Sequence, residues 1–395
     1  MKVFVTGIGA ISGIGLNSGE HLASFRAGKN GLGKITLFPT RHEVPVSEVK
    51  KNNRQLQEAL GIPLQKTLSR TALLGITAAQ EAWKDAAIEP ESGLRIGFIS
   101  SNSTGGMDLS EQFYPLFRDD NKQGRLRLVA SHDAGDSTEQ IASYLGLTGF
   151  RTTISTACSS AANALMLGAR MIRQGLFDVV IAGGTDALCR FTLNGFSSLM
   201  ILDKEPCRPF DISRAGLNLG EGAGYLVLQS EKSLRRQPYA ALCGYANNND
   251  AYHQTASSPE GTGAWLAMKN ALEVAGVKPD EVDYINAHGT GTPNNDASES
   301  KAICRLFGDK IPPFSSTKAF TGHTLGAAGG LEAVFSVLAI DRGIYYPNLH
   351  FATPIEETGL IPVTSYSENH TVRTVLSNSF GFGGNNTSLV FRKTN

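Results

Sequence analysis

Short runs of β-branched and aromatic residues alternate along the chain with longer stretches rich in alanine and leucine. The run at 177–182 is almost continuously apolar, as expected for a strand inside a sheet that is covered on both faces. Strands that alternate with helices in this way predict βαβ units and a largely parallel sheet. We expect strands at 2–7, 95–100, 179–183, 225–228, 284–287, 375–377 and 388–391, and helices at 70–86, 159–174, 263–275, 296–307 and 325–341.

Two pairs of distant segments have similar sequences. Residues 219–228 and 382–391 each pass from a glycine-rich loop into a final apolar strand. Two helical stretches also end alike, as MIRQG at 171–175 and AIDRG at 339–343. A repeat on this scale predicts a duplicated fold, and chance similarity of glycine-rich loops is the alternative. We place one half at residues 1–238 and the other at 239–395.

The charges of the chain balance, with 36 basic and 36 acidic residues among 395. Because there is no basic stripe or acidic tail, we expect no nucleic-acid partner. No apolar run approaches the ~18 residues of a membrane-spanning helix, so we expect no membrane span. The five cysteines stand singly, which predicts neither a disulfide framework nor a metal site. We therefore expect a soluble, cytoplasmic α/β protein.

The opening strand leads into GIGAISG at 7–13, which resembles a dinucleotide-binding loop. Its spacing is GxGxxxG rather than GxGxxG, and the acidic residue expected about 20 positions later is missing. We interpret the segment as a structural turn and expect no bound cofactor.

Cys158 lies among small residues at the start of a predicted helix, in TACSSAANA at 156–164. The unpaired N–H groups and the dipole at a helix N-terminus favour a thiolate and can hold an oxyanion. A buried, inert cysteine is the alternative that this segment alone leaves open.

Two further loops carry candidate partners for a nucleophile. His288 follows a predicted strand, in NAHGTGTP at 286–293, and Lys318 and His323 lie in STKAFTGHTLGAAGG at 316–330. A nucleophile needs a group that handles protons and donors for the carbonyl oxygen, and imidazoles can supply both. Each histidine alone fits a structural role, but three such loops together indicate an active site.

Four motifs occur in a fixed order: TACSS at 156–160, HGTGTP at 288–293, KAFTGHTLGAAG at 318–329 and NSFGFGG at 378–384. Together they resemble the elongating β-ketoacyl-acyl-carrier-protein synthases, which use a Cys-His-His site. The resemblance spans essentially the whole chain. It implies an α/β thiolase fold, in which duplicated βαβαβ halves form a five-layered αβαβα sandwich.

The resemblance also implies a reaction, the decarboxylative condensation of malonyl-carrier protein with an acyl group held on Cys158. His288 and His323 would donate hydrogen bonds to the malonyl thioester oxygen, and the N–H groups of Cys158 and Phe382 would hold the acyl-transfer oxyanion. Phe382 resembles the family's gate to the acyl pocket. The implied partners are an acyl carrier protein and a second subunit, in a homodimer or in a heterodimer with a paralogue.

For Lys318 the resemblance implies an ion pair with a carboxylate, and Glu299 is the best candidate by its motif position. Lys318 would then tune and orient His323 rather than contact the substrate. An ordinary surface lysine is the alternative.

The sequence departs from the family in two segments. Residues 383–386 read GGNN, where the usual loop is GGTN, so Asn385 replaces a threonine. The segment 128–139, which borders the acyl tunnel in the family, is less apolar than in housekeeping enzymes. It carries Asp133, Asp136 and Glu139.

These carboxylates suggest a substrate, because charges beside a tunnel for long saturated chains cost desolvation energy. We expect short, unsaturated or aryl-capped acyl groups. With 188–196 and 205–210, the segment resembles the ketosynthases of aryl-polyene clusters.

Other members of the superfamily fit less well. A non-catalytic chain-length partner typically lacks the nucleophile, which Cys158 supplies here. A degradative thiolase needs a second catalytic cysteine in a late Cys-x-Gly loop, where this chain has GFGG at 381–384. An initiating synthase would have asparagine in place of His323. Chain length, starter group and the identity of the carrier protein stay open.

Overall fold

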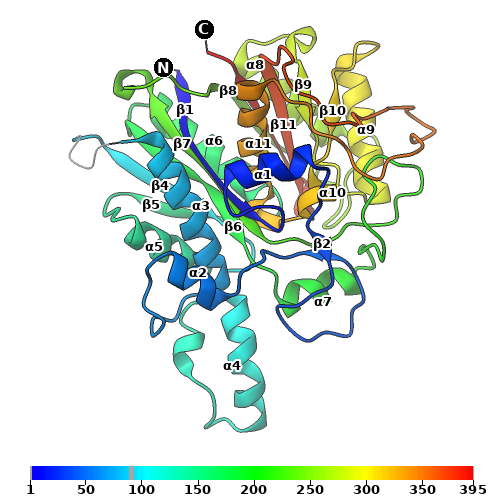
Figure 1. Ribbon diagram of the computed structural model, residues 1–395. Helices are drawn as coiled ribbons and strands as arrows, with labels where there is room; N and C mark the ends of the chain where they lie inside the picture. Colours follow the sequence, from blue (N-terminus) through cyan, green and yellow to red (C-terminus); the bar gives the residue numbers. More distant parts are fainter. Residues whose placement is uncertain (1, 89–92, 395) are drawn as a thin grey trace.

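The computed structural model describes residues 2–88 and 93–394, and its centre is a ten-stranded sheet (Figure 1). From the outer edge inward, the N-terminal arm is β5 (Arg151–Ile154), β4 (Ile96–Ser101), β6 (Val179–Asp186), β7 (Gly222–Ser230) and β1 (Val3–Ser12). The C-terminal arm is β10 (Phe314–Ser315), β9 (Tyr284–Asn286), β11 (Thr374–Gly381), β12 (Asn385–Arg392) and β8 (Ala240–Asn249). The arms meet where β1 pairs with β8. The expected duplication is confirmed, because the two similar glycine-rich segments form β7 and β12 at matching places.

The prediction of a largely parallel sheet is wrong. Pairs at the outer ends, such as β4 with β6 and β9 with β11, are parallel. The pairs between β6 and β11 through the middle of the sheet are antiparallel. For one of these pairs the reason is local, since β11 and β12 are joined by the short turn Phe382–Gly384, and a tight connection allows only an antiparallel pair.

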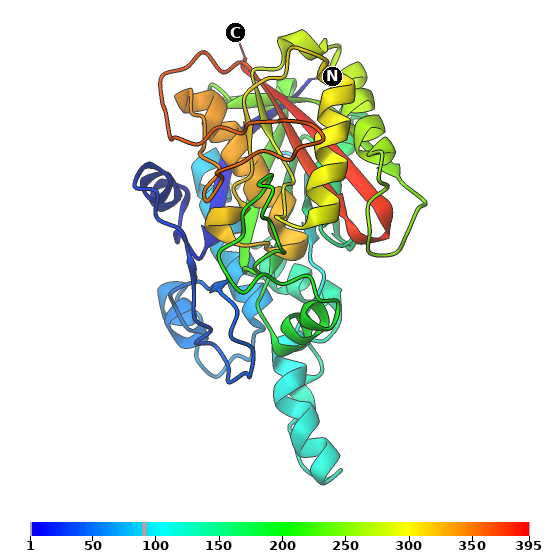
Figure 2. The ribbon, with the colours of Figure 1, turned by 90° about the vertical axis from the view of Figure 1, so that its right-hand side faces the viewer.

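Helices form the other layers (Figures 1 and 2). The central helices α6 (Ser160–Arg173) and α11 (Ala328–Arg342) each contact strands of both arms. On the outer faces, α3 (Arg70–Ala86) with α5 (Ala134–Tyr144) covers the N-terminal arm, and α8 (Thr262–Ala275) with α9 (Pro293–Phe307) covers the C-terminal arm. This is the expected αβαβα sandwich. Its centre is tightly packed, because a Cβ added at Gly224 of β7 would lie 2.3 Å from the backbone nitrogen of Leu331 in α11.

The glycines at the start of the chain serve packing. Gly7 and Gly9 lie within β1, not in the turn that we expected. A Cβ on Gly7 would lie 2.2 Å from the Ala82 carbonyl oxygen, and one on Gly9 would lie 2.0 Å from that of Ala78. The two glycines therefore let α3 lie directly on β1.

The remaining elements are α1 (Ser18–Arg26), α2 (Asn53–Ala59), α4 (Met107–Asp119), α7 (Arg190–Ser198), α10 (Lys318–Thr321) and a small sheet of β2 (Leu32–Gly33) and β3 (Val46–Ser47). Of these, α4 projects from the body of the molecule (Figures 1 and 2). In the part of the chain that is described, no helix has the length and apolar character needed to cross a membrane.

Candidate active site

Cys158 lies in the turn between β5 and α6, directly before Ser159, the N-cap of α6. Ala157 has a φ of 53°, a left-handed conformation that costs a non-glycine residue roughly 1–2 kcal/mol. Ser160 holds this turn, since its Oγ donates to the Ala157 carbonyl at 2.5 Å and accepts from the Thr156 N–H at 2.8 Å. The sharp turn places Cys158 at the end of the central helix, beside the C-terminal arm.

The thiol of Cys158 is buried, at 6% exposure. Burial raises its pKa to about 11, and the charge of Lys318 and the N–H groups of Phe382 and Cys158 oppose this rise. Desolvation therefore opposes the stabilisation of a thiolate that is expected at a helix start. The N–H groups of Phe382 and Cys158 nevertheless face the sulfur, where an oxyanion would need them.

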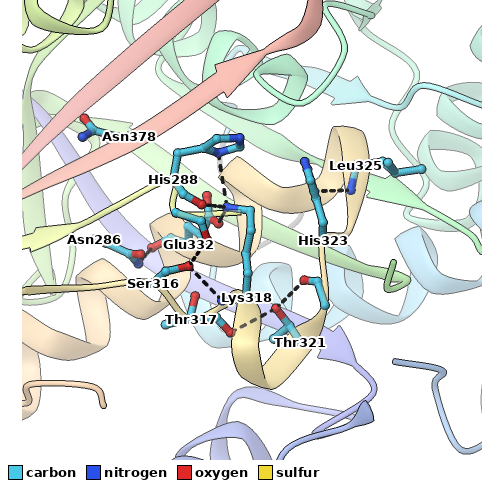
Figure 3. A network of polar contacts seen from close by, with 12 residues as sticks. Asn286, His288, Ser316, Thr317, Lys318, Thr321, His323, Leu325, Glu332 and Asn378 are labelled. Carbon is cyan, nitrogen blue, oxygen red and sulfur yellow. Dashed lines mark hydrogen bonds and ion pairs between the residues drawn. The ribbon is translucent and has the colours of Figure 1, made fainter. Parts of the chain in front are cut away.

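His288 follows β9, and His323 follows α10 (Figure 3). Their ring centroids are 5.4 Å apart, and the rings are nearly perpendicular at 84°. The Leu325 N–H donates to Nδ1 of His323 at 3.1 Å, and Lys318 Nζ lies 3.2 Å from Nδ1 of His288. A backbone N–H and an ammonium can only donate, so the Nδ1 atoms of both histidines are acceptors. Each ring therefore carries its proton on Nε2.

Both histidines are neutral at pH 7. Burial, and after it the charge of Lys318, holds the pKa of His288 and of His323 well below the usual range. A neutral imidazole with its proton on Nε2 is a hydrogen-bond donor in a fixed direction. The pair can therefore donate two hydrogen bonds without holding a charge of its own.

Lys318, at 2% exposure, uses its three donors within the site (Figure 3). They reach the Glu332 carboxylate on α11, the His288 carbonyl at 2.5 Å and Nδ1 of His288. The expected pairing of Lys318 with Glu299 is wrong, because α11 brings Glu332 to the ammonium. The expected orientation of His323 is also corrected, since Lys318 bonds to His288 and acts on His323 through its charge.

Glu299 instead supports the backbone around His288. It accepts hydrogen bonds from the N–H groups of His288 at 2.9 Å and Gly289 at 2.8 Å, and from Asn378 Nδ2 at 3.0 Å. Burial raises the pKa of Glu299 to about 7, and these donors oppose the rise. The residue is correctly placed near the site, but its partner is the turn after β9.

Two cavities meet at Cys158. One, of about 310 Å³, is lined by Cys158 together with both histidines and Phe382. The other, of about 400 Å³, is largely apolar. Its lining includes Cys158, Phe191, Phe196, Leu199, Leu325 and Phe382. The rings of Phe196 and Phe382 border both cavities and stack with centroids 5.8 Å apart at 16°. Phe382 thus stands where the two cavities join.

Comparison with known proteins identifies the family. The family model "Beta-ketoacyl synthase, N-terminal domain" matches residues 1–233, and "Beta-ketoacyl synthase, C-terminal domain" matches residues 239–352. The chain belongs to the β-ketoacyl synthase family. It is 35% identical to the 3-oxoacyl-[acyl-carrier-protein] synthase 2 of Staphylococcus aureus (strain MRSA252), over 100% of this chain and 98% of that protein.

Two solved structures of the family are similar over the whole chain. The ishigamide ketosynthase/chain length factor gives a TM-score of 0.93 at 32% identity, covering 100% of this chain and 99% of that one. A ketosynthase in complex with its chain length factor from Xenorhabdus doucetiae gives a TM-score of 0.82 at 33% identity, covering 100% and 98%. The chain therefore has the thiolase-type fold of these synthases.

Sequence reasoning missed Glu332, although a signal for it exists. Residues 328–340 read AGGLEAVFSVLAI, so Glu332 is the single charged residue in an otherwise apolar stretch. A charge in such a helix is stable only with a buried partner. That partner is Lys318.

Proposed function

We propose that this chain is an active 3-oxoacyl-[acyl-carrier-protein] synthase, a condensing acyltransferase. The observation that carries the proposal is the convergence of Cys158, His288 and His323 on one cavity from loops far apart in the sequence. A nucleophile beside two neutral N–H donors suits acyl transfer followed by stabilisation of an enolate oxygen. Family membership and the name of the curated relative support the same reaction.

The first step transfers an acyl group from a carrier thioester to Cys158. A bond forms between Sγ and the acyl carbon, the carbon–sulfur bond of the carrier thioester breaks, and the thiol proton ends on the departing carrier sulfur. Because the pKa of the thiol is about 11, the proton leaves as the sulfur attacks rather than beforehand. The N–H groups of Cys158 and Phe382 hold the transient oxyanion.

The second step uses malonyl-carrier protein. The bond to CO₂ breaks, and its electron pair forms an enolate whose oxygen accepts hydrogen bonds from Nε2–H of His288 and His323. The enolate carbon attacks the acyl-cysteine carbonyl, a carbon–carbon bond forms, and the Cys158 thiolate leaves and takes a proton from solvent. Lys318 and Glu299 contribute by positioning His288.

The proposed partners are an acyl carrier protein and a second subunit. The curated relative is named for the carrier protein, and two structural neighbours pair a ketosynthase with a chain length factor. On the projecting α4, Tyr114 is 61% and Leu116 is 54% exposed, an apolar surface that a second subunit would bury. Such a surface is compatible with a homodimer and with a heterodimer formed with a paralogue. Light scattering should give a particle of about twice 42.1 kDa, and a lasting monomer would favour the heterodimer.

We also propose the division of the chain into residues 1–238 and 239–395. In its support, β8 begins at Ala240 and has the place in its arm that β1 has in the other. A cytoplasmic location is the matching proposal, since all five cysteines are free, as is usual in a reducing compartment.

The proposed substrate is a short, unsaturated or aryl-capped acyl group, as in aryl-polyene synthesis. The expected carboxylates give less support than anticipated. Asp133 caps α5 and Glu139 pairs with Arg151 at 2.6 Å, and within one chain they line neither cavity. The support comes instead from the apolar cavity beside Cys158, whose aromatic lining suits a flat, conjugated chain. Loading of hexanoyl, decanoyl, myristoyl and cinnamoyl thioesters tests this. A steady rise to myristoyl with an inert cinnamoyl substrate would favour fatty-acid elongation.

The reaction itself is tested with acyl- and malonyl-carrier protein. The full chain, purified with a partner subunit if it requires one, should release CO₂ and form a 3-oxoacyl-carrier product. Intact-mass analysis should show one acyl adduct, on Cys158. A chain that forms no adduct would be a non-catalytic subunit.

A further inference from the structure

The loop that carries Phe382 is bonded along its backbone to the end of β8 and the segment after it. The Gly383 N–H donates to the Gln254 carbonyl at 2.7 Å, and the Gly383 carbonyl accepts from Asn249 Nδ2 at 2.9 Å. The Gly384 carbonyl accepts from the Asp250 N–H at 2.9 Å. We call residues 381–384 the gate loop. Its position is fixed on this side by the C-terminal arm.

On the other side, the first residue after the gate loop is bonded to the nucleophile turn. Asn385 Oδ1 accepts hydrogen bonds from Ser159 Oγ at 2.7 Å, Asn163 Nδ2 at 3.0 Å and Asn247 Nδ2 at 2.6 Å. Ser159 is the neighbour of Cys158, and Asn163 lies one turn further along α6. A single carbonyl oxygen therefore links the gate loop, the central helix and β8.

Four side chains here are bonded to one another, and we call them the carboxamide cluster: Asn163, Asn247, Asn385 and Thr387. Asn247 Nδ2 also donates to Thr387 Oγ1 at 2.7 Å, and Thr387 Oγ1 donates to Asn163 Oδ1 at 2.9 Å. Asn163 Nδ2 bonds Thr156 Oγ1 as well, at 2.9 Å. The cluster joins the turn before Cys158, the helix after it and the strand after the gate loop.

Position 385 is also where the sequence departs from the family's Gly-Gly-Thr-Asn loop. A threonine hydroxyl is attached directly to Cβ, so it ends one bond short of the carboxamide oxygen of asparagine. With threonine here, Ser159, Asn163 and Asn247 would have to reach further for a shared acceptor. Hydrogen bonds weaken steeply with distance and poor angle, so the link between gate and nucleophile turn would loosen.

We propose that Asn385 is a positioning residue that holds the gate loop closed against the nucleophile turn, an inference that rests on the proposed function. In the closed position Phe382 stacks on Phe196 where the two cavities join, and its N–H faces the sulfur of Cys158. A substrate chain that passes from one cavity to the other must displace this ring. Asn385 therefore slows the passage of the acyl chain, and it shields the acyl-cysteine from water.

The test is the variant Asn385→Thr, studied in the full chain with any partner subunit that it requires. Three rates are measured: single-turnover acylation of Cys158, hydrolysis of the acyl-cysteine, and malonyl decarboxylation by the acylated protein. We expect acylation to rise and hydrolysis to rise on the order of tenfold, the scale of one lost hydrogen bond. Decarboxylation should stay unchanged, because its donors, His288 and His323, lie outside the gate loop. Asn247→Ala, which removes one donor from an exposed position, should give the same pattern more weakly.

The matched control is Asn248→Ala. Asn248 is the next residue of β8, and its Oδ1 accepts from Asn270 Nδ2 of α8 at 3.1 Å, away from the gate. This variant also loses one asparagine–asparagine hydrogen bond, and it should leave all three rates unchanged. If Asn385→Thr lowers all three rates together, or leaves them as in the control, the inference is overturned. A wild-type protein that is never acylated would overturn the proposed function, and this inference with it.

Discussion

The turn from β5 into α6 and the turn from β10 into α11 occupy matching places in the two arms, but they meet opposite physical demands. The first holds a neutral thiol, Cys158, and needs only small residues and one strained alanine. The second buries Lys318, which must have acceptors for all of its donors, and Glu332 and His288 supply them. The two halves of the duplicated fold therefore place two turns at the same site. One of them carries the nucleophile, and the other carries hydrogen-bond donors.

The largest effect is expected from removing the nucleophile. Cys158→Ala should abolish the acyl adduct and the condensation, because no other thiol lines the cavities. Cys207→Ala is the control, since Cys207 is also buried with a pKa raised to about 12 but lies outside both linings. Intact-mass spectrometry after incubation with acyl-carrier protein measures both. An acyl adduct that persists in Cys158→Ala would show that Cys158 is not the nucleophile.

Loss of the buried ammonium should mainly affect stability. Lys318→Met leaves Glu332 without its partner, and breaking a buried ion pair in this way costs about 3–5 kcal/mol. Urea unfolding of the single variant and of Lys318→Met/Glu332→Gln measures the effect. The double variant should recover part of the loss, because the second change removes the uncompensated charge. Equal losses in both proteins would contradict the pairing of Lys318 with Glu332.

The two histidines should separate the half-reactions. His288→Ala and His323→Ala each remove one donor to the enolate oxygen, which is worth about 10²–10³ in rate. Decarboxylation should fall by this factor, and acylation of Cys158 should change little. CO₂ release and adduct formation are compared for each variant. Decarboxylation within a few-fold of wild type in both would show that these donors do not act on the malonyl group.

A smaller effect concerns pH. The pKa of Glu299 is raised from 4.5 to about 7 by burial, so the folded protein holds this proton more tightly than the unfolded chain. The contribution of Glu299 to stability is therefore present below pH 4.5 and is lost as the pH rises to 7, by at most about 3 kcal/mol. The free energy of unfolding of wild type minus that of Glu299→Gln should fall over this interval. A flat difference would mean that the carboxyl is not perturbed.

The sequence located the reactive residues better than it predicted their environment. Cys158, His288 and His323 stand out because small residues and glycines surround them at ends of strands and starts of helices. The pairing of Lys318 with Glu332, the pKa of the thiol and the antiparallel centre of the sheet were not predictable in the same way. Each depends on which distant elements pack together, and motif spacing within one loop carries no information about that.

The pairing of β1 has a consequence for synthesis of the chain. Residues 3–12 leave the ribosome well before their neighbours in the sheet, which are β7, at 222–230, and β8, at 240–249. Until those strands have been translated, a fully buried apolar strand has no partner along either edge. Such exposed edges invite misassembly. At about 5–20 residues per second, the interval lasts on the order of ten seconds or more, a period in which the nascent chain is a natural client for chaperones.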